Sequence, residues 1–341
     1  MQKVVNVAEI AEPDWNFVES QYTGPAVDWR YFAANPRNAL ERSVRRPKLG
    51  RYRACWQATR ALSAPDDVVI SHLPRTTHWQ SHFMRAMGRD QRHMAFAFNF
   101  TDLPEGRSRA SMSRTFQRVD RFVVCTDFER QLYADHFQLP IERFELLHWA
   151  IDTPEIDPSF AVPWPRYYSS AGGEARDFKT LLQAFEKLPH LKLVIVTRPQ
   201  ALAGLRIPPN VHVFHNLPHA QFWTVVGRSE ALIVPLRDSQ TPCGNISLVG
   251  AMTLSRPLVS TLTEGTRDYA HHERNALVTA PGDVAAMTQA IARLEEEPAL
   301  RQRLGAEGKA FAQEHCDPRR WAEYIQAYVT RRPSAAPQKT Q

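Results

Sequence analysis

Short apolar runs alternate with stretches of helical periodicity along this chain, and no other feature of the sequence limits the possible folds so strongly. The central runs are continuously apolar, as is typical of parallel strands covered on both faces. Such alternation builds βαβ units, so the sequence predicts an α/β fold with two doubly wound, Rossmann-like domains. We expect strands at Val4–Ala8, Asp67–His72, Met94–Asn99, Arg121–Thr126 and Phe144–His148 in the first half, and at Tyr167–Ala171, Leu193–Thr197, Val211–His215, Leu232–Leu236, Pro257–Thr261 and Asn275–Thr279 in the second.

Capping residues indicate where several of the intervening helices begin. Thr126-Asp-Phe-Glu129 has the pattern of a capping box, in which the first and last side chains each bond to the other residue's backbone N–H. Asp283 follows Pro-Gly and is expected to cap a helix, and another helix is expected to start near Pro298. After Cys316, an Asp-Pro pair predicts the start of a last amphipathic helix.

The length of 341 residues suggests two domains, and a proline-rich stretch indicates where they meet. The segment Asp152–Pro165 contains four prolines, which favours a stiff, extended linker. We therefore expect a first domain at 1–158 and a second at 159–317. A C-terminal helix at 318–332 is expected to pack back across the domains, and residues 333–341 are expected to be disordered.

Charge, cysteine spacing and hydropathy exclude several classes of protein. The net charge of +6 permits an anionic partner, but no aromatic-interleaved basic motif indicates nucleic-acid binding. The four cysteines are far apart and form no CxxC pair, which argues against a zinc site and favours a reducing cytoplasm. No apolar run approaches the ~18–20 residues of a membrane span, and residues 1–19 lack the pattern of a signal peptide.

The loop after the first predicted strand of the second domain is a candidate phosphate site. Gly172 and Gly173 allow the backbone to approach a ligand closely, and Arg176 offers a fixed fork of donors to phosphate oxygens. The helix that follows is expected to point its N-terminus at the same place. The alternative is an ordinary glycine turn with a solvated arginine.

A second candidate lies after the predicted strand Leu232–Leu236. Small polar residues there lead into an apolar helix, and Gly244, Asn245 and Ser247 could present N–H and hydroxyl donors. The alternative is an ordinary capped helix. Two helix N-termini at the carboxyl ends of strands favour a diphosphate over a single phosphate.

Motifs in residues 165–317 resemble the donor-binding domain of GT-B glycosyltransferases, specifically the retaining bacterial polysaccharide type of the group 1 class. The order and spacing of several segments agree with that family across about 150 residues. The first half is a looser match, at Asp120–Arg130 and Leu146–Asp152. The segments that carry the resemblance in the second half are Arg176–Ala184, Gly250–Val259, Asn275–Asp283 and Leu304–Lys309.

The resemblance implies roles for particular residues of the second domain. Arg176 stands where the family has a basic residue that holds the donor diphosphate, whereas the family's second basic residue falls at Ala171. The family's paired glutamates fall at Pro242 and Gly250, so the pair is missing. Asn245, Ser247 and a carboxylate from Glu264 are expected to replace part of its role. Base and ribose contacts are expected from Thr197, Arg198, His215 and Asn216, for which plain surface loops are the alternative.

The first domain is expected to lie on the acceptor side of a cleft between the two domains. His72, Arg75 and Thr76 follow one predicted strand, and Asn99 and Asp102 follow the next. Asp102 could polarise the acceptor hydroxyl, with helix capping as the alternative. Six basic residues in Arg42–Arg53, with Arg30 and Arg37 upstream, suggest contact with anionic lipid, with a solvated basic face as the alternative.

Taken with the resemblance, these residues predict a glycosyltransferase that moves a sugar from a UDP- or GDP-sugar to a glycan or lipid-linked acceptor in bacterial surface or exopolysaccharide synthesis. A hexosyltransferase with a retaining outcome is expected, without a metal or a permanently bound cofactor, in the cytoplasm or at the inner face of the membrane. Two alternatives stay open: a non-catalytic GT-B relative that acts as a binding or scaffold protein, and a sugar-nucleotide epimerase.

Overall fold

The computed structural model of the chain describes residues 1–9, 17–44, 48–237 and 242–331. It divides the chain into two compact units. The first contains Met1–Leu147 and the residues from Arg319 onward, and the second contains His148–Pro318. The tail predicted at 333–341 lies outside the described residues. Each unit is built on its own sheet and is described by itself.

The first unit contains a sheet of six parallel strands in the order β2-β1-β3-β4-β5-β6. Its strands are β1 (Lys3–Ala8), β2 (Asp28–Ala33), β3 (Val68–His72), β4 (Arg92–Phe96), β5 (Arg121–Val124) and β6 (Phe144–Leu146). Its helices are α1 (Phe17–Gln21), α2 (Ala39–Ser43), α3 (Leu49–Ala61), α4 (Pro74–Ala86), α5 (Gly106–Phe116), α6 (Asp127–Phe137), the 3-10 turn η1 (Ile141–Arg143) and α12 (Pro318–Thr330).

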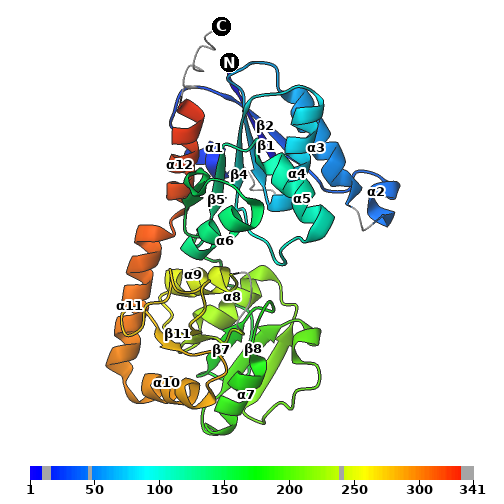
Figure 1. Cartoon of the computed structure of the whole chain (residues 1–341). Coiled ribbons are helices and arrows are strands. Elements are labelled where there is room, and N and C mark those ends of the chain that lie inside the picture. Colours follow the sequence, from blue (N-terminus) through cyan, green and yellow to red (C-terminus); the bar gives the residue numbers. More distant parts are fainter. Residues whose placement is uncertain (10–16, 45–47, 238–241, 332–341) are drawn as a thin grey trace. The chain divides into compact units, whose positions relative to one another are not determined.

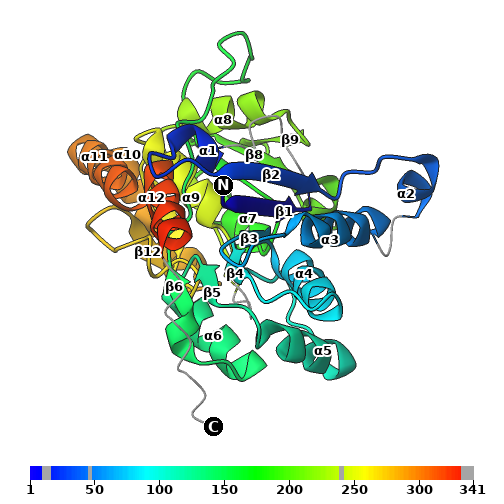
Figure 2. The same ribbon diagram turned by 90° about the horizontal axis from the view of Figure 1, so that it is seen from above.

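Alternate residues of these strands pack on opposite faces of the sheet. Val5 and Val69 face a layer formed by α3 and α4, and Phe122 faces α5 and α6. On the other face, Val4 and Ile70 pack against α12, including its fully buried Ile325. Figure 2 shows α3, α4 and α5 on one side of β1 and β3, with α12 on the other. Coverage on both faces explains why these strands are continuously apolar in sequence.

The second unit contains another sheet of six parallel strands, in the order β12-β11-β10-β7-β8-β9. Helices α7 and α10 cover one face, and α8 and α9 cover the other (Figure 1). The strands are β7 (Tyr168–Ala171), β8 (Leu193–Thr197), β9 (Val211–His215), β10 (Leu232–Val234), β11 (Leu258–Thr261) and β12 (Leu277–Thr279). The helices are α7 (Phe178–Glu186), the 3-10 turn η2 (Pro199–Leu202), α8 (His219–Gly227), α9 (Asn245–Thr253), α10 (Val284–Glu296) and α11 (Pro298–His315).

The strand order of each sheet reverses at one place, and the carboxyl ends there form a crevice that binds ligands in folds of this type. In the second unit the reversal lies between β7 and β10, because the chain proceeds from β7 outward to β9 and then returns to β10 on the other side. In the first unit it lies between β1 and β3. The loops after these four strands are therefore where each unit is expected to hold a ligand.

The predicted helix starts are confirmed. Thr126 and Glu129 form a complete capping box at α6, and the Asp283 carboxylate accepts a hydrogen bond from the Ala286 N–H at 2.8 Å. The proline-rich segment expected to be a linker packs on the second unit, because Phe160 and Trp164 contact its core and the Asp157 N–H donates to Thr224 at 2.8 Å. Among the described helices, none combines the length and apolarity needed to cross a bilayer.

Buried histidines give the first unit a specific acid sensitivity. The His93 ring lies between two hydroxyls, Ser71 Oγ at 2.7 Å and Ser81 Oγ at 3.1 Å, and is almost completely buried. Burial lowers the pKa of His93 to about 3, and it likewise lowers the pKa of His72 to about 3 and that of His78 to about 4. All three rings are therefore neutral in the folded protein at neutral pH.

We predict that the stability of the first unit falls as the pH drops below about 6.5, the ordinary histidine pKa in an unfolded chain. Below this pH the histidines are protonated in the unfolded state but not in the folded state. The free energy of unfolding therefore falls by up to about 1.4 kcal/mol per pH unit for each histidine. Urea unfolding between pH 7 and pH 5 measures this slope. In His93→Gln the free energy of unfolding should fall less steeply with decreasing pH. Equal slopes for the variant and the parent would contradict a lowered pKa of His93 in the folded protein.

Candidate functional site

The side chain of Arg176 bridges the reversal point of the second sheet. It comes from the loop between β7 and α7, and its Nη2 donates to the Ser247 hydroxyl of α9 at 2.9 Å. The same nitrogen donates to the Ala171 carbonyl at the end of β7 at 3.1 Å, and Nη1 donates to the Glu174 carbonyl at 3.0 Å. Ser247 Oγ also donates to the Ala171 carbonyl, at 3.1 Å. One arginine thus ties the loop after β7 to the helix that follows β10.

Arg176 is only 7% exposed and has no carboxylate partner within ion-pair distance among the described residues. Its Nε is buried and has no hydrogen-bond partner in the part of the chain that the structure describes. Desolvation lowers the pKa of Arg176 to about 10, so the guanidinium still carries its charge at neutral pH. A buried cation that is not neutralised is unfavourable unless an anion joins it. The alternative of a solvated arginine is therefore wrong.

The absence of a side chain at Gly172 leaves the space that the Arg176 guanidinium occupies. It has a φ of 119°, and a Cβ at this position would lie 2.4 Å from Arg176 Nη2. Ala175 in the same loop also has a positive φ, of 52°. The loop is held in this conformation by pairing with the segment after β10, since the Arg237 N–H donates to the Ala175 carbonyl at 2.9 Å.

The two helix N-termini at this site differ. At α7 the Asp177 carboxylate accepts hydrogen bonds from the Thr180 N–H at 3.1 Å and from its hydroxyl at 2.6 Å. This cap places a negative charge at the helix start and occupies the Thr180 N–H, so α7 is less suited to bind an anion than α9. At α9 the capping residue is Gly244, with a φ of 96° and no side-chain cap. Only α9 of this pair therefore offers an uncapped N-terminus to an anion.

Other buried polar atoms near these carboxyl ends have no partner among the described residues. They are Thr197 Oγ1 at the end of β8, Asn245 Oδ1 at the start of α9, and Thr279 Oγ1 at the end of β12. Buried polar groups are seldom left unpaired in native proteins, and ligand sites are where exceptions gather. Sequence reasoning missed Thr279, although it is a polar residue that ends a predicted strand.

The residues expected to contact base and ribose lie together. A Cβ on Gly173 would lie 3.6 Å from Thr197 Oγ1, so the loops after β7 and β8 are in contact. His215 Nδ1 lies 3.3 Å from the Thr197 carbonyl, and the Asn216 N–H donates to that same oxygen at 3.3 Å. Arg198 is exposed and pairs with Glu174 at 2.6 Å.

Glu264 lies on an exposed loop after β11 and pairs with Arg267 at 2.8 Å. A Cβ on the neighbouring Gly265 would lie 2.7 Å from Pro242 Cα, so this loop is packed against the segment that leads into α9. The expected proximity of Glu264 to the start of α9 therefore has a structural basis. Residues 238–241 between β10 and this segment lie outside the described residues.

The acceptor-side residues of the first unit lie at the carboxyl ends of β3 and β4. His72 is buried, with Nε2 3.4 Å from Asn6 Oδ1 of β1, so these two side chains meet at the reversal point of this sheet. Asn6 was missed by sequence reasoning, although it is the single polar residue within the apolar run Val4–Ala8. Thr76 is 1% exposed, and its hydroxyl has no partner in the described structure.

The remaining acceptor-side residues are more open to solvent. Arg75 and Asp102 are exposed, and Asn99 is half-buried. The backbone near them is constrained, because Leu73 and Ala97 have φ values of 71° and 48°. Strained non-glycine residues of this kind concentrate at functional sites.

The predicted basic surface is partly neutralised. Lys48 and Arg51 both pair with Glu9, and Arg53 pairs with Glu41 at 2.8 Å. Arg51 is buried. Arg42 is exposed, and Arg45 and Arg46 lie outside the described residues. Membrane contact through Arg42–Arg53 stays a prediction, with fewer free charges than the sequence suggests.

Comparison with known proteins shows which family the second unit is similar to. Residues 167–311 match the family model of glycosyl transferases group 1. A curated relative, the lipopolysaccharide core biosynthesis glycosyltransferase LpsD of Rhizobium meliloti (strain 1021), is 36% identical over 73 residues. That match covers 21% of this chain and 21% of the relative, so the chain aligns with about a fifth of the relative's length.

Solved structures match nearly the whole chain. Sucrose-phosphate synthase from Thermosynechococcus elongatus has a TM-score of 0.70 at 14% identity, covering 96% of this chain and 98% of its own. HepE from Anabaena, solved in complex with UDP-glucose, has a TM-score of 0.71 at 10% identity, covering 97% of this chain and 100% of its own. The predicted α/β, GT-B fold is therefore confirmed, and the family match of the second unit supports a glycosyltransferase.

The packing of α9 predicts the effect of adding a side chain at position 250. A Cβ on Gly250 would lie 2.0 Å from the buried indole ring of Trp223, which cannot move without disturbing the core. We expect Gly250→Ala to lower the free energy of unfolding by about 1–3 kcal/mol, the usual range for overpacking. Urea unfolding measures the change. Gly173→Ala is the control, because its nearest neighbour would be at 3.6 Å, and equal stability of both variants would contradict this packing.

Proposed function

We propose that this protein is a glycosyltransferase that takes a sugar from a nucleotide-sugar donor bound in its second unit. The observation that carries the proposal is that Arg176 is buried at the reversal point without a counterion among the described residues, beside the N-terminus of α9, where the structure describes no side-chain cap. A guanidinium fork and free backbone N–H groups suit the oxygens of a diphosphate. The similarity to HepE, which was solved with UDP-glucose, supports a UDP-sugar as donor and leaves a GDP-sugar as the second possibility.

The proposed mechanism uses these groups to stabilise the leaving diphosphate. As the bond between sugar and phosphate breaks, negative charge grows on the phosphate oxygens. Arg176 and the N–H groups of Asn245 and Ser247 are held in place before the reaction, so they stabilise that charge without reorganising. In the retaining outcome that we propose, a leaving phosphate oxygen accepts the proton of the incoming acceptor hydroxyl, and no enzymic nucleophile is required.

We assign the other polar groups of the second unit to the nucleoside and the donor sugar. Thr197, Arg198, His215 and Asn216 form one connected set and are assigned to base and ribose. Asn245 Oδ1 is a buried hydrogen-bond acceptor without a partner in the described structure, so we propose that it accepts a hydrogen bond from a hydroxyl of the donor sugar. Glu264 supplies the carboxylate that Pro242 and Gly250 do not.

The acceptor is proposed to be a glycan or lipid-linked sugar that meets the first unit at His72, Arg75, Thr76, Asn99 and Asp102. The sequence similarity to an enzyme named for lipopolysaccharide core biosynthesis supports a role in bacterial surface polysaccharide synthesis. The neutral His72 ring and the Thr76 hydroxyl, which has no partner among the described residues, are suited to hydrogen-bonding sugar hydroxyls. An inner-face, peripheral membrane location would bring the enzyme to a lipid-linked acceptor.

Arg176→Ala is expected to weaken UDP binding by about 1.5–3 kcal/mol, the range for hydrogen bonds to charged groups, or about ten- to a hundredfold in Kd. Isothermal titration calorimetry measures the change. The matched control is Lys179→Ala, which removes an exposed cation of α7. Because Arg176 also ties two loops together, a second variant is Asn245→Ala, which removes an Oδ1 that has no hydrogen-bond partner among the described residues. Unchanged affinity of Arg176→Ala for UDP, together with unchanged affinity of Asn245→Ala for UDP-glucose, would contradict the donor assignment.

Glu264→Gln is expected to leave UDP affinity nearly unchanged but to reduce transfer tenfold or more, about 1.4 kcal/mol of barrier. An interaction made mainly in the transition state has this effect on turnover without loss of binding. Sugar transfer from UDP-glucose and other donors, assayed with a panel of glycan acceptors, measures it, with the exposed Glu186→Gln of α7 as control. Full activity would remove Glu264 from the mechanism. Absence of transfer by the parent protein would favour the non-catalytic alternative, and release of an epimerised sugar nucleotide without acceptor would favour the epimerase.

A further inference from the structure

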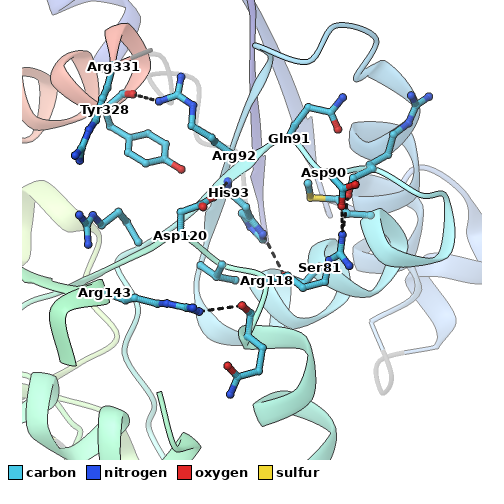
Figure 3. A pocket seen from close by; sticks show the side chains of 15 residues that line it. Ser81, Asp90, Gln91, Arg92, His93, Arg118, Asp120, Arg143, Tyr328 and Arg331 are labelled. Carbon is cyan, nitrogen blue, oxygen red and sulfur yellow. Dashed lines mark hydrogen bonds and ion pairs between the residues drawn. The ribbon is translucent and has the colours of Figure 1, made fainter. Parts of the chain in front are cut away.

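A basic pocket of about 670 Å³ lies in the first unit, at the amino ends of β4 and β5 (Figure 3). Its walls come from the loops that precede these strands, from η1 and from α12. Arg92 and Arg121 are the first residues of β4 and β5, whereas His72 is the last residue of β3 and Asn99 follows β4, at the opposite, carboxyl edge of the sheet. The pocket is therefore separate from the acceptor-side residues, and nothing in the proposed function uses it.

Positive charge dominates the lining of this pocket. Six arginines line it together with two aspartates, Asp90 and Asp120. Asp90 pairs with Arg118, and Asp120 accepts a hydrogen bond from the His93 backbone N–H at 2.6 Å. No other arginine of the set has a carboxylate within ion-pair distance in the described part of the chain. The arginines are Arg89, Arg92, Arg118, Arg121, Arg143 and Arg331.

Backbone carbonyls hold several of these arginines in position. Arg92 donates to the Tyr328 and Val329 carbonyls at the end of α12, at 2.6 and 3.0 Å (Figure 3). Arg143 donates to the Gln117 carbonyl at 2.9 Å, and Arg121 to the Glu142 carbonyl at 2.5 Å. A carbonyl orients a guanidinium but does not neutralise it, so the positive charge of the pocket persists.

Hydrogen-bonding groups around the pocket are also incompletely satisfied. The Nε atoms of Arg89 and Arg92 and the hydroxyl of Tyr328 are buried without partners among the described residues. Tyr328 is itself more than nine-tenths buried. Unpaired donors and an excess of fixed positive charge in a pocket of ligand size indicate a missing anionic partner. The chain's own C-terminal segment is unsuited to that role, because residues 332–341 include Arg332 and Lys339 and no acidic residue.

We propose that this pocket binds a phosphate-bearing anion carrying two or more negative charges. Planar guanidinium forks match phosphate oxygens in geometry as well as in charge, and several arginines from different elements can engage one diphosphate group. Because Arg92 also bonds the last turn of α12, a bound anion strengthens the attachment of that helix to the sheet.

The test uses inorganic pyrophosphate as probe and the double variant Arg121→Gln/Arg143→Gln. Each substitution removes a charge but keeps a polar side chain with a hydrogen-bond donor at that position. Isothermal titration calorimetry is expected to show binding to the parent that weakens at least tenfold in the double variant and weakens with added salt. Arg114→Gln, on the exposed face of α5, is the matched control and should bind like the parent. Equal affinity of the double variant and the parent would overturn the proposal.

Two further arms separate this site from the donor site and identify the source of the phosphate. Pyrophosphate binding that depends on Arg121 and Arg143 should persist in Arg176→Ala. Its complete loss in a folded Arg176→Ala protein would assign all binding to the second unit and overturn the proposal. Vesicles of phosphatidylcholine with and without phosphatidic acid then identify the source. Capture by the acidic vesicles that is lost in the double variant indicates a lipid phosphate, and pyrophosphate binding without such capture indicates a soluble one.

Discussion

The bridge from Arg176 to Ser247 and to the Ala171 carbonyl is the interaction on which the site of the second unit depends. It crosses the point where the strand order reverses, and so it joins two βα loops that the chain reaches 71 residues apart. The guanidinium is buried without a counterion among the described residues, which costs free energy. A bound anion offsets this cost by neutralising the guanidinium. The leaving diphosphate of a nucleotide sugar is an anion of suitable shape and charge.

Both units have residues with positive φ directly after their strands or in the loops that follow them. Leu73 and Ala97 follow strands of the first unit with positive φ, and Gly172, Ala175 and Asn216 do so in the second. Of the seven described non-glycine residues with positive φ, four lie in loops that leave the carboxyl ends of strands. A parallel sheet supplies a rigid platform, and these loops can then be shaped for binding without weakening the core.

The strands could be predicted from the sequence because burial on both faces makes them continuously apolar. Leu193–Thr197, which is buried along its whole length, was predicted with its observed bounds. Asp28–Ala33 was missed, since this edge strand has no buried residue and carries Asp28 and Arg30 within its run. A pattern that depends on burial gives no signal for such a strand.

The site was only partly predictable, because its decisive properties depend on partners that are distant in sequence. The position of Arg176 at a βα loop follows from the strand pattern, but its burial and its bond to Ser247 do not. The carboxylate of Asp177 was not expected to cap α7, which left α9 as the one uncapped helix start of the pair. Similarly, the charges of Lys48 and Arg51 look free in sequence but meet Glu9 in the fold.

Hydrogen–deuterium exchange with and without UDP-glucose tests the central claim most directly, because it locates a ligand on the backbone. Donor binding at this site should slow exchange at residues 172–178 and 244–248, the segments that Arg176 joins. Exchange in β12 and in the first-unit loops that precede β4 and β5 should change little. Binding that leaves both predicted segments unprotected, or that protects only the first unit, would contradict a donor site built around Arg176.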